Sequence, residues 1–291
     1  MSNGNVMVRW RNGFGNCLFQ YTFARLFAEK YGMNLSYLPE NGRSCFKNPV
    51  EYDFISDLSV STIDESRAID IFKISRTYGN FEKFFELDVD KISKMNFIVG
   101  YPSYIQGLIE DYRIYADHID TINSWFERPE QVNEKDLVFH IRLGDNWNAR
   151  NATNGGVIPQ EYYLKAAELC DYEKLYIVTD DVDDKYLDSF SHLNPIFLTA
   201  DEEHEDEFTK TFRFLNKKNV NYCVRDFNFL RSFKNIVVGN STFSWWAAFL
   251  GQNKNVYVYK HWQRGHVNLG QTELPHWNIL DVESNKKFLD L

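Results

Sequence analysis

Residues 5–38, NVMVRWRNGFGNCLFQYTFARLFAEKYGMNLSYL, indicate the class of fold most clearly. The first six of these residues alternate in polarity, which predicts a strand, and residues 11–16 form a turn that contains two glycines. From Leu18 to about Tyr31 apolar side chains recur at helical spacing, and residues 34–38 predict a second strand. A strand, a loop, a helix and a further strand in this order begin an α/β layer.

The second half of the chain continues this alternation. It predicts strands at 137–141, 175–179, 195–198, 235–239 and 255–259, and helices at 159–169, 226–233 and 241–250. Strands that alternate with helices imply a parallel sheet covered on both faces. We therefore expect an α/β protein of two domains, residues 1–130 and 131–291, while residues 51–96 give no clear pattern.

Composition narrows the function classes. The 291 residues are 44% hydrophobic and 25% charged, which excludes a mainly disordered chain. The net charge of −9 disfavours broad nucleic-acid binding and adhesion to an anionic membrane, since both need a basic surface, but it allows a small phosphorylated ligand. With no visible signal peptide and no run of 18 apolar residues, we expect no stable membrane insertion and a cytoplasmic location.

The cysteines and acidic residues do not predict a metal site. Cys17, Cys45, Cys170 and Cys223 form no C-x-x-C pair and have no zinc-ligand spacing, so we interpret them as reduced, partly buried thiols, although two disulfides are formally possible. The acidic run at 201–207 is typical of a solvated loop or helix start. We expect no metal and no bound cofactor.

Residues 12–16, Asn-Gly-Phe-Gly-Asn, lie between the first strand and its helix. Glycines let a backbone approach a ligand closely, and the helix N-terminus offers N–H groups to an anion. The third glycine of the dinucleotide fingerprint is missing, because Leu18 occupies its position. A tight turn without a ligand explains the segment equally well.

Residues 140–145, His-Ile-Arg-Leu-Gly-Asp, follow at the carboxyl end of a predicted strand, the edge where open α/β sheets bind ligands. His140 and Arg142 alternate and therefore leave the strand on one face. A guanidinium there can clamp a diphosphate bidentately. The alternative is a salt bridge between Arg142 and Asp145, and the two interpretations are compatible because Asp145 could orient Arg142.

Residues 239–246, GNSTFSWW, join another strand to a helix. A cap explains one of the three hydroxyls there, and the others could hold phosphate oxygens. The two tryptophans are more typical of a core than of a sugar platform. Asp226, fifteen positions before Ser241, is explained as a helix N-cap, or it could accept two N–H bonds from a guanine edge.

Three of these segments resemble the α-1,2-fucosyltransferase family. GFGNCLFQYTFAR at 13–25 resembles its G-x-G-N-Q-x-F-Q-Y-x-x-A-R opening, and HIRLGD at 140–145 resembles its H-x-R-R-G-D. NSTFSWWAA at 240–248 is similar to its N-S-[ST]-F-S-W-W-x-A block, which is the most specific of the three. The matches occur in the family order and span nearly the whole chain.

The resemblance implies a GT-B type glycosyltransferase, with two Rossmann-like domains facing across a cleft. Residues 1–130 would hold the acceptor side and the first glycine loop, and residues 131–291 would bind the GDP-sugar. The implied reaction moves L-fucose from GDP-fucose to a galactoside hydroxyl of an oligosaccharide or glycan. It makes an α-1,2 linkage with inversion and without a metal.

The resemblance also implies roles for individual residues. Arg142 would bind the pyrophosphate and stabilise the departing GDP, and Asn16 would face the donor phosphates, so these two are the expected catalytic residues. His140 and Asp226 would read the guanine. The residues expected to bind the donor are Gly13, Gly15, His140, Asp145, Asp226, Asn240, Ser241, Thr242, Phe243 and Ser244.

Two departures from the family pattern leave other outcomes open. Leu143 replaces the second arginine of the family, and Cys17 replaces its glutamine. Adjacent strand residues point to opposite faces, so the change at Leu143 could spare the diphosphate site and alter packing or the acceptor side. The alternative is therefore a transferase that uses another GDP-deoxysugar or makes another linkage.

Two further function classes compete. A nicotinamide-dependent oxidoreductase is suggested by the glycine loop and by Glu40, roughly 20 residues beyond it, but it leaves residues 140–145 and 239–246 unexplained. A non-catalytic carbohydrate-binding protein is suggested by the late aromatic residues Trp262 and Trp277 and the histidines near them. It predicts sugar binding that does not depend on a nucleotide.

Overall fold

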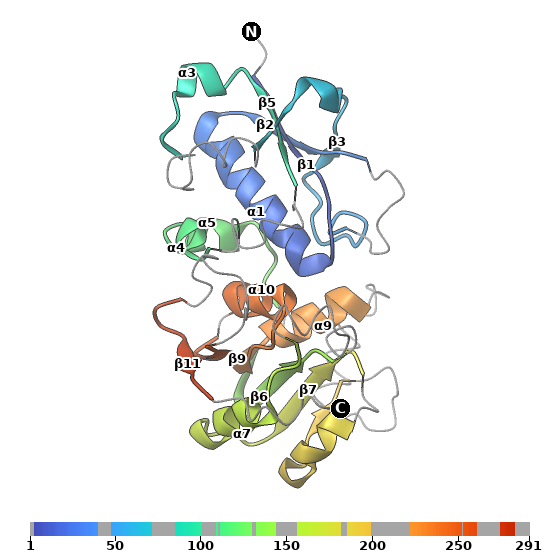
Figure 1. The fold of residues 1–291 in the computed structure, drawn as a ribbon, viewed down its shortest axis with the longest axis vertical. Coiled ribbons are helices and arrows are strands. Elements are labelled where there is room, and N and C mark those ends of the chain that lie inside the picture. The colour runs from blue at the N-terminus through green and yellow to red at the C-terminus, as the bar shows by residue number, and fades with distance from the viewer. Residues whose placement is uncertain are drawn as a thin grey trace. The chain divides into compact units, whose positions relative to one another are not determined.

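The structure is a computed structural model. It describes residues 3–39, 48–71, 85–100, 109, 111–129, 132–143, 156–181, 185–198, 222–251, 253–260 and 274–282. The chain divides into two compact units, and the division falls between Phe126 and Glu127 (Figure 1). Each unit contains a parallel sheet with helices, which confirms the predicted α/β class.

The first unit, which we call unit 1, is built on a five-stranded sheet. Its strands are β1 (Asn5–Val8), β2 (Asn34–Tyr37), β3 (Ser59–Val60), β4 (Ile69–Asp70) and β5 (Asn96–Val99), in the order β3-β2-β1-β5-β4 with every pairing parallel. The long helix is α1 (Phe14–Tyr31). Shorter helical segments are η1 (Glu65–Arg67), α3 (Val89–Ile92), α4 (Arg113–Ala116) and α5 (Ile119–Ser124).

Helix α1 covers one face of this sheet. The Phe27 ring lies 5.3 Å from the ring of Phe97, which is paired with Val6 across β1 and β5. Because side chains alternate along a strand, their neighbours Met7 and Ile98 belong to the opposite face. The helix ends at Gly32, whose φ of 60° is the left-handed conformation that glycine adopts without strain. The predicted strand, turn, helix and strand of residues 5–38 are confirmed.

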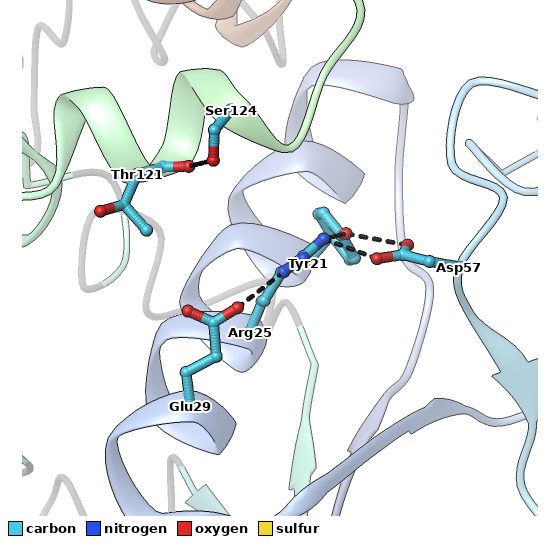
Figure 2. Close-up of polar contacts among 6 residues, drawn as sticks. All are labelled: Tyr21, Arg25, Glu29, Asp57, Thr121 and Ser124. Atoms are coloured by element: carbon cyan, nitrogen blue, oxygen red, sulfur yellow. Dashed lines mark hydrogen bonds and ion pairs between the residues drawn. The ribbon is translucent and has the colours of Figure 1, made fainter.

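Arg25 fastens α1 to the rest of unit 1 (Figure 2). Its Nη1 lies 2.7 Å from Asp57 Oδ2, and its Nε donates to Glu29 at 3.0 Å. Its guanidinium carbon lies 4.4 Å from the centroid of the Trp125 ring. The Tyr21 hydroxyl also donates to Asp57, at 3.1 Å, and burial raises the pKa of Tyr21. Tyr21 and Arg25, which belong to the motif at residues 13–25, therefore have a structural role in unit 1.

The second unit, which we call unit 2, has a six-stranded sheet. Its strands are β6 (Asn133–Ile141), β7 (Leu175–Thr179), β8 (Ile196–Phe197), β9 (Phe233–Val237), β10 (Asn255–Tyr259) and β11 (Asn278–Leu280), in the order β11-β10-β9-β6-β7-β8 with every pairing parallel. Its helices are α7 (Gln160–Leu169), η4 (Lys185–Leu193), α9 (Tyr222–Arg231) and α10 (Thr242–Leu250).

The strand order reverses direction in both units. In unit 2 the chain adds β7 and β8 on one side of β6, and then places β9, β10 and β11 on the other side. In unit 1 it adds β2 and β3 on one side of β1, while β5 pairs on the other side. Open parallel sheets bind ligands outside the carboxyl ends of the strands at such a reversal. The fold therefore favours the β6–β9 junction and the β1–β5 junction as places where a ligand binds.

Three predicted starts are too late in the chain, those of β6, α9 and β9, and β9 begins at Phe233 and not at 235. Strand β6 begins at Asn133 and not at 137, because Asn133 and Asp136 are buried and pair with each other at 2.8 Å. Helix α9 begins at Tyr222, so Asp226 lies inside it and is not its N-cap. Val224, Phe227 and Leu230 are all buried at helical spacing, a pattern that begins two residues before the predicted start at Asp226.

The core holds the paired tryptophans. Trp245 and Trp246 are both fully buried, and the Trp245 ring stacks on Phe249 at 5.1 Å. Their prediction as core residues is confirmed. Cys17, Cys170 and Cys223 are free thiols, whereas Cys45 lies outside the described residues. In the described part of the chain, no helix combines the length and the apolar character needed to cross a membrane.

Candidate functional site

The carboxyl edge of the unit 2 sheet carries two of the predicted segments. Strands β6 and β9 are neighbours, and Phe139 is paired with Val237. Arg142 follows the end of β6, and residues 239–241 follow the end of β9 and lead into α10. These segments are about 100 residues apart in the chain and meet at the strand reversal, because parallel neighbours end at the same edge.

Gly239 lets the two strand ends approach each other closely. A Cβ atom at this position would lie 2.4 Å from the His140 carbonyl oxygen and 3.0 Å from His140 Nδ1. The Tyr163 hydroxyl, 3.2 Å from the same point, donates to the His140 carbonyl at 2.9 Å. Only a residue without a side chain fits here, so Gly239 fixes the distance between β9 and His140.

His140 is an uncharged, buried side chain at this edge. It is 8% exposed, and its Nδ1 has no hydrogen-bond partner among the described residues. Burial lowers the pKa of His140 to about 3, and the positive charge of Arg142 acts in the same direction. Its ring lies 5.6 Å from that of Phe243. An unpaired buried polar atom costs about 1–3 kcal/mol, which a ligand hydrogen bond would recover.

The side chains of Arg142 and Leu143 lie on opposite faces of the strand end. Leu143 is fully buried in the core cluster of unit 2, together with Ile141, and its N–H donates to Asp180 Oδ1 at 2.8 Å. Arg142 is half-buried and lies close enough to His140 to act on its charge. The position of the family's second arginine is therefore a packing position here, and Asp180 at the end of β7 holds this backbone in place.

The hydroxyls at the start of α10 are not equivalent. Ser241 caps the helix, because its Oγ accepts the Phe243 N–H at 3.3 Å. Ser244 is fully buried and donates to the carbonyls of Gly239 and Ser241 at 3.4 and 3.2 Å, so it builds the turn. Thr242 is partly exposed.

Asn240 completes this loop. Its side-chain amide donates to the Gly156 carbonyl at 3.3 Å and ties the loop to the segment before α7. Gly156 adopts a left-handed backbone with φ 58°.

Asp226 belongs to a helix that packs beside the start of α10. The rings of Phe227 and Phe243 are 5.3 Å apart, and the Asp226 carboxylate forms an ion pair with Arg225, with Nη2 and Oδ1 2.6 Å apart. Burial raises the pKa of Asp226 to about 6, although the charge of Arg225 opposes the shift. This carboxylate therefore changes its charge just below neutral pH.

The glycine loop lies in unit 1. Gly13 begins α1 without a side-chain cap, and a Cβ there would meet no atom within 4 Å. The fully buried Gln20 donates to the Arg11 carbonyl at 2.9 Å and accepts the Arg11 N–H at 3.1 Å. Cys17 Sγ lies 3.7 Å from the same carbonyl. Gln20 is not among the residues that the sequence predicted to be functional. A glutamine among the apolar positions of a helix could have indicated this polar contact, because such a side chain needs a buried partner.

The predicted site residues fall into three groups. In unit 2, the segments that carry Arg142 and Ser241 meet at one sheet edge. Gly13, Gly15 and Asn16 lie at the start of α1 in unit 1. Asp145 lies outside the described residues. Among the residues that the structure covers, no group of three or more His, Cys, Asp or Glu could hold a metal ion.

Comparison with known families supports the sequence resemblance. Residues 202–280 match the model of the family described as glycosyl transferase family 11. The matched segment contains Asp226 and the tryptophan block of residues 240–248, which is the most specific part of the sequence resemblance.

Individual relatives are more distant. The O-antigen biosynthesis glycosyltransferase WbnK of Escherichia coli is 26% identical over 152 residues, which are 50% of this chain and 44% of WbnK. The match thus spans less than half of the length of that relative.

Solved fucosyltransferase structures are also similar. NodZ from Bradyrhizobium is 14% identical, with a TM-score of 0.46 over 91% of this chain and 98% of NodZ. A mutant of Arabidopsis thaliana FUT1 in complex with GDP is 11% identical, with a TM-score of 0.48 over 88% of this chain and 70% of FUT1.

Proposed function

We propose that this protein is a metal-independent, inverting fucosyltransferase of GT-B type. It transfers L-fucose from GDP-fucose to a galactoside hydroxyl and forms an α-1,2 linkage. The observation that carries the proposal is the junction of β6 and β9. Arg142 follows the end of β6 and the N-terminus of α10 follows the end of β9, so both lie at the same edge of a parallel sheet. The match of residues 202–280 to glycosyl transferase family 11 supports it.

The chemistry of this edge suits a departing nucleoside diphosphate. When the bond between the anomeric carbon and the β-phosphate oxygen breaks, negative charge grows on that oxygen. The Arg142 guanidinium and the positive end of α10 stabilise this charge where it develops. The acceptor oxygen bonds to the opposite face of the anomeric carbon as the bond to the β-phosphate oxygen breaks, so the configuration inverts. GDP leaves with the electron pair of the broken bond, and the hydroxyl proton passes to a carboxylate or to water.

His140 suits a site that must not carry further charge. With a pKa of about 3, its imidazole is neutral at physiological pH. Its buried Nδ1 therefore offers a hydrogen bond without adding charge beside Arg142. We assign His140 to the guanine, together with the ionised Asp226, whose two carboxylate oxygens match adjacent N–H donors on a guanine edge.

The remaining predicted residues take supporting roles in the proposal. Ser241, Thr242 and the Phe243 backbone lie at the phosphate end of the site, while Ser244 and Asn240 hold the loop. We assign Asp145, which lies outside the described residues, to the orientation of Arg142. Asn16, with Gly13 and Gly15, presents the start of α1 to the donor phosphates.

The first experiment asks which nucleotide binds. Thermal unfolding is measured with GDP, UDP and NAD, and a ligand at a hundred times its Kd stabilises the fold by ~2.7 kcal/mol. The proposal expects a shift with GDP. A shift with NAD alone would establish the oxidoreductase alternative, and sugar binding without any nucleotide shift would establish a carbohydrate-binding protein.

The second experiment identifies the reaction. The protein is incubated with GDP-fucose and a panel of galactosides, and the product linkage is read by NMR. Leu143 and Cys17, which replace the family's arginine and glutamine, motivate a parallel arm with other GDP-deoxysugars. Transfer from a different donor, or a different linkage in the product, would contradict the proposed GDP-fucose donor or the proposed α-1,2 linkage. The cytoplasmic location is also part of the proposal, and cell fractionation tests it.

A further inference from the structure

Unit 1 contains a cavity that the proposed donor site does not use. Its volume is about 190 Å³, and it is lined by Arg9, Glu65, Ser66, Ala68, Asp70 and Ile98. Arg9 directly follows β1, and Ile98 lies in the neighbouring β5. The cavity therefore lies at the strand reversal of unit 1, at the carboxyl edge where parallel sheets bind ligands.

The cavity opens on the face of the sheet opposite α1. Met7, Ile98 and Asp70 are register partners across β1, β5 and β4, so their side chains share one face. Arg9, two residues beyond Met7, continues that face. Phe97, on the other face, packs against α1. The glycine loop and this cavity are thus different features of unit 1.

A short helical turn brings a carboxylate to the mouth of the cavity. Asp64 caps η1 by accepting the Ser66 N–H at 2.9 Å, and the Ala68 N–H donates to the Glu65 carbonyl at 3.1 Å. This turn holds Glu65 beside Arg9, with Nη2 and Oε2 2.8 Å apart. Among the described residues, neither Arg9 Nη1 nor Glu65 Oε1 has a further hydrogen-bond partner, and both side chains are partly exposed.

The charges of the lining select the class of ligand. The described lining carries one guanidinium, that of Arg9, among two carboxylates, those of Glu65 and Asp70. Charges of both signs in one lining favour neither a phosphate nor a metal ion. A neutral ligand rich in hydroxyls suits the site, because each hydroxyl can both donate to a carboxylate and accept from a guanidinium.

The size and the apolar wall suit one sugar ring. At about 30 Å³ per water, the volume corresponds to about six water molecules, which is the scale of a single monosaccharide. Ile98 and Ala68 belong to, or pack against, a small apolar cluster and offer a surface for the C–H groups of a ring. Exposed polar groups beside an apolar wall are a suitable arrangement for such a ligand.

We propose that this cavity binds one pyranose ring of the galactoside acceptor. Glu65 and Asp70 accept hydrogen bonds from ring hydroxyls, and Arg9 donates one. The inference rests on the proposed function, because it names the place in unit 1 where the acceptor of that reaction binds.

The test separates acceptor binding from donor binding. Glu65→Gln and Asp70→Asn keep the side-chain shape and remove the charge, and Glu29→Gln is the matched control, since Glu29 is also an exposed carboxylate paired with an arginine. For each protein, three quantities are measured: the KM for lactose, the thermal shift with GDP, and the slow hydrolysis of GDP-fucose without acceptor. Saturation-transfer NMR with methyl β-D-galactopyranoside reads sugar binding directly.

We expect Glu65→Gln and Asp70→Asn to raise the lactose KM about tenfold or more, which corresponds to the loss of a hydrogen bond to a charged group. The GDP shift and the hydrolysis rate should stay within twofold of wild type, and Glu29→Gln should match wild type throughout. Normal transfer with an unchanged lactose KM in both variants would overturn the inference and leave the fucosyltransferase proposal standing.

The opposite failure has a different signature. If GDP gives no shift and no fucose is transferred, the proposed function fails. In that case the NMR signal still decides the cavity: a galactoside signal that both variants abolish supports the sugar site, and no signal with the wild-type protein overturns it.

Discussion

His140 is buried and Asp226 is partly buried, and burial moves the pKa values of these two side chains in opposite directions. The pKa of His140 falls to about 3 and that of Asp226 rises to about 6. Burial disfavours the charged form of each side chain, which is the imidazolium in one case and the carboxylate in the other. At neutral pH the first is uncharged and the second is ionised.

Arg142→Ala should reduce kcat by about a hundredfold or more, because one fixed donor to a developing charge is worth ~3–4 kcal/mol of barrier. Turnover is measured with GDP-fucose and acceptor at saturation. Arg128→Ala is the control, since Arg128 is an exposed arginine of the same unit without a proposed role. Near-normal turnover of the Arg142 variant would remove this residue from the mechanism.

Asp226 should make GDP affinity depend on pH. The ionised carboxylate is the form that accepts guanine N–H groups, so affinity should fall as the pH decreases through about 6. Calorimetric Kd values from pH 5 to 8 are compared for the wild type and Asp226→Asn. Because GDP itself also titrates, the result is the difference between the two profiles. Parallel profiles would show that Asp226 does not bind the base.

His140 should contribute to acid destabilisation. Its pKa is lower in the folded state than the ordinary value of 6.5, so the unfolded state binds the proton first. Stability is therefore fully present above pH 6.5 and falls by about 1.4 kcal/mol per pH unit below it. Denaturant unfolding at pH 7.5 and 5 should show a smaller loss for His140→Gln than for the wild type. Equal losses would contradict the buried, neutral imidazole.

At the scale of elements, the site depends on how β6, β9 and α10 meet. Gly239 allows the close approach of the strand ends, Tyr163 from α7 holds the His140 carbonyl, and Asp180 at the end of β7 holds the backbone of Leu143. Three elements thus fix one strand end through backbone groups. The hydrogen bonds of Ser244 then set the direction of the turn into α10.

Gly239→Ala should destabilise the protein by about 1–3 kcal/mol, because the new methyl group would lie 2.4 Å from the His140 carbonyl oxygen. Gly13→Ala is the matched control: its φ is −77° and a Cβ meets no atom within 4 Å. Because Gly13 is the N-cap residue of α1, where alanine is less favourable than glycine, that change should still cost about 1 kcal/mol or less. Urea midpoints measure both variants, and equal stability would show that the strands can separate without cost.

At the scale of the whole molecule, the chain builds the same type of parallel sheet twice. Each sheet reverses its strand order beside its first strand, β1 or β6, and each reversal carries polar groups at the carboxyl edge. In unit 2 these groups suit an anionic leaving group, whereas in unit 1 the cavity lining suits a neutral sugar. The two halves of the proposed reaction are thus assigned to two different sheet edges.

The sequence by itself determined the alternation of strands and helices, since periodic burial is a local property. Strand β7, strand β10 and helix α1 lie where the pattern predicted them, and the tryptophans of α10 lie in the core. The start of β6 lies four residues before the predicted one, because its polar residues, such as Asp136, are satisfied by partners that only folding supplies.

Which motif residues a ligand can reach depends on the packed fold. The three hydroxyls near Ser241 look alike in the sequence, but the Ser244 hydroxyl is buried and bonded to carbonyls of the turn, whereas Thr242 is partly exposed. The cavity beside Arg9 has no sequence signature, since it joins Arg9 after β1, Asp70 of β4 and Ile98 of β5, which are far apart in the chain. Local pattern records which face of an element is buried, whereas contact between distant segments depends on sheet order, and that order arises only when the whole chain packs.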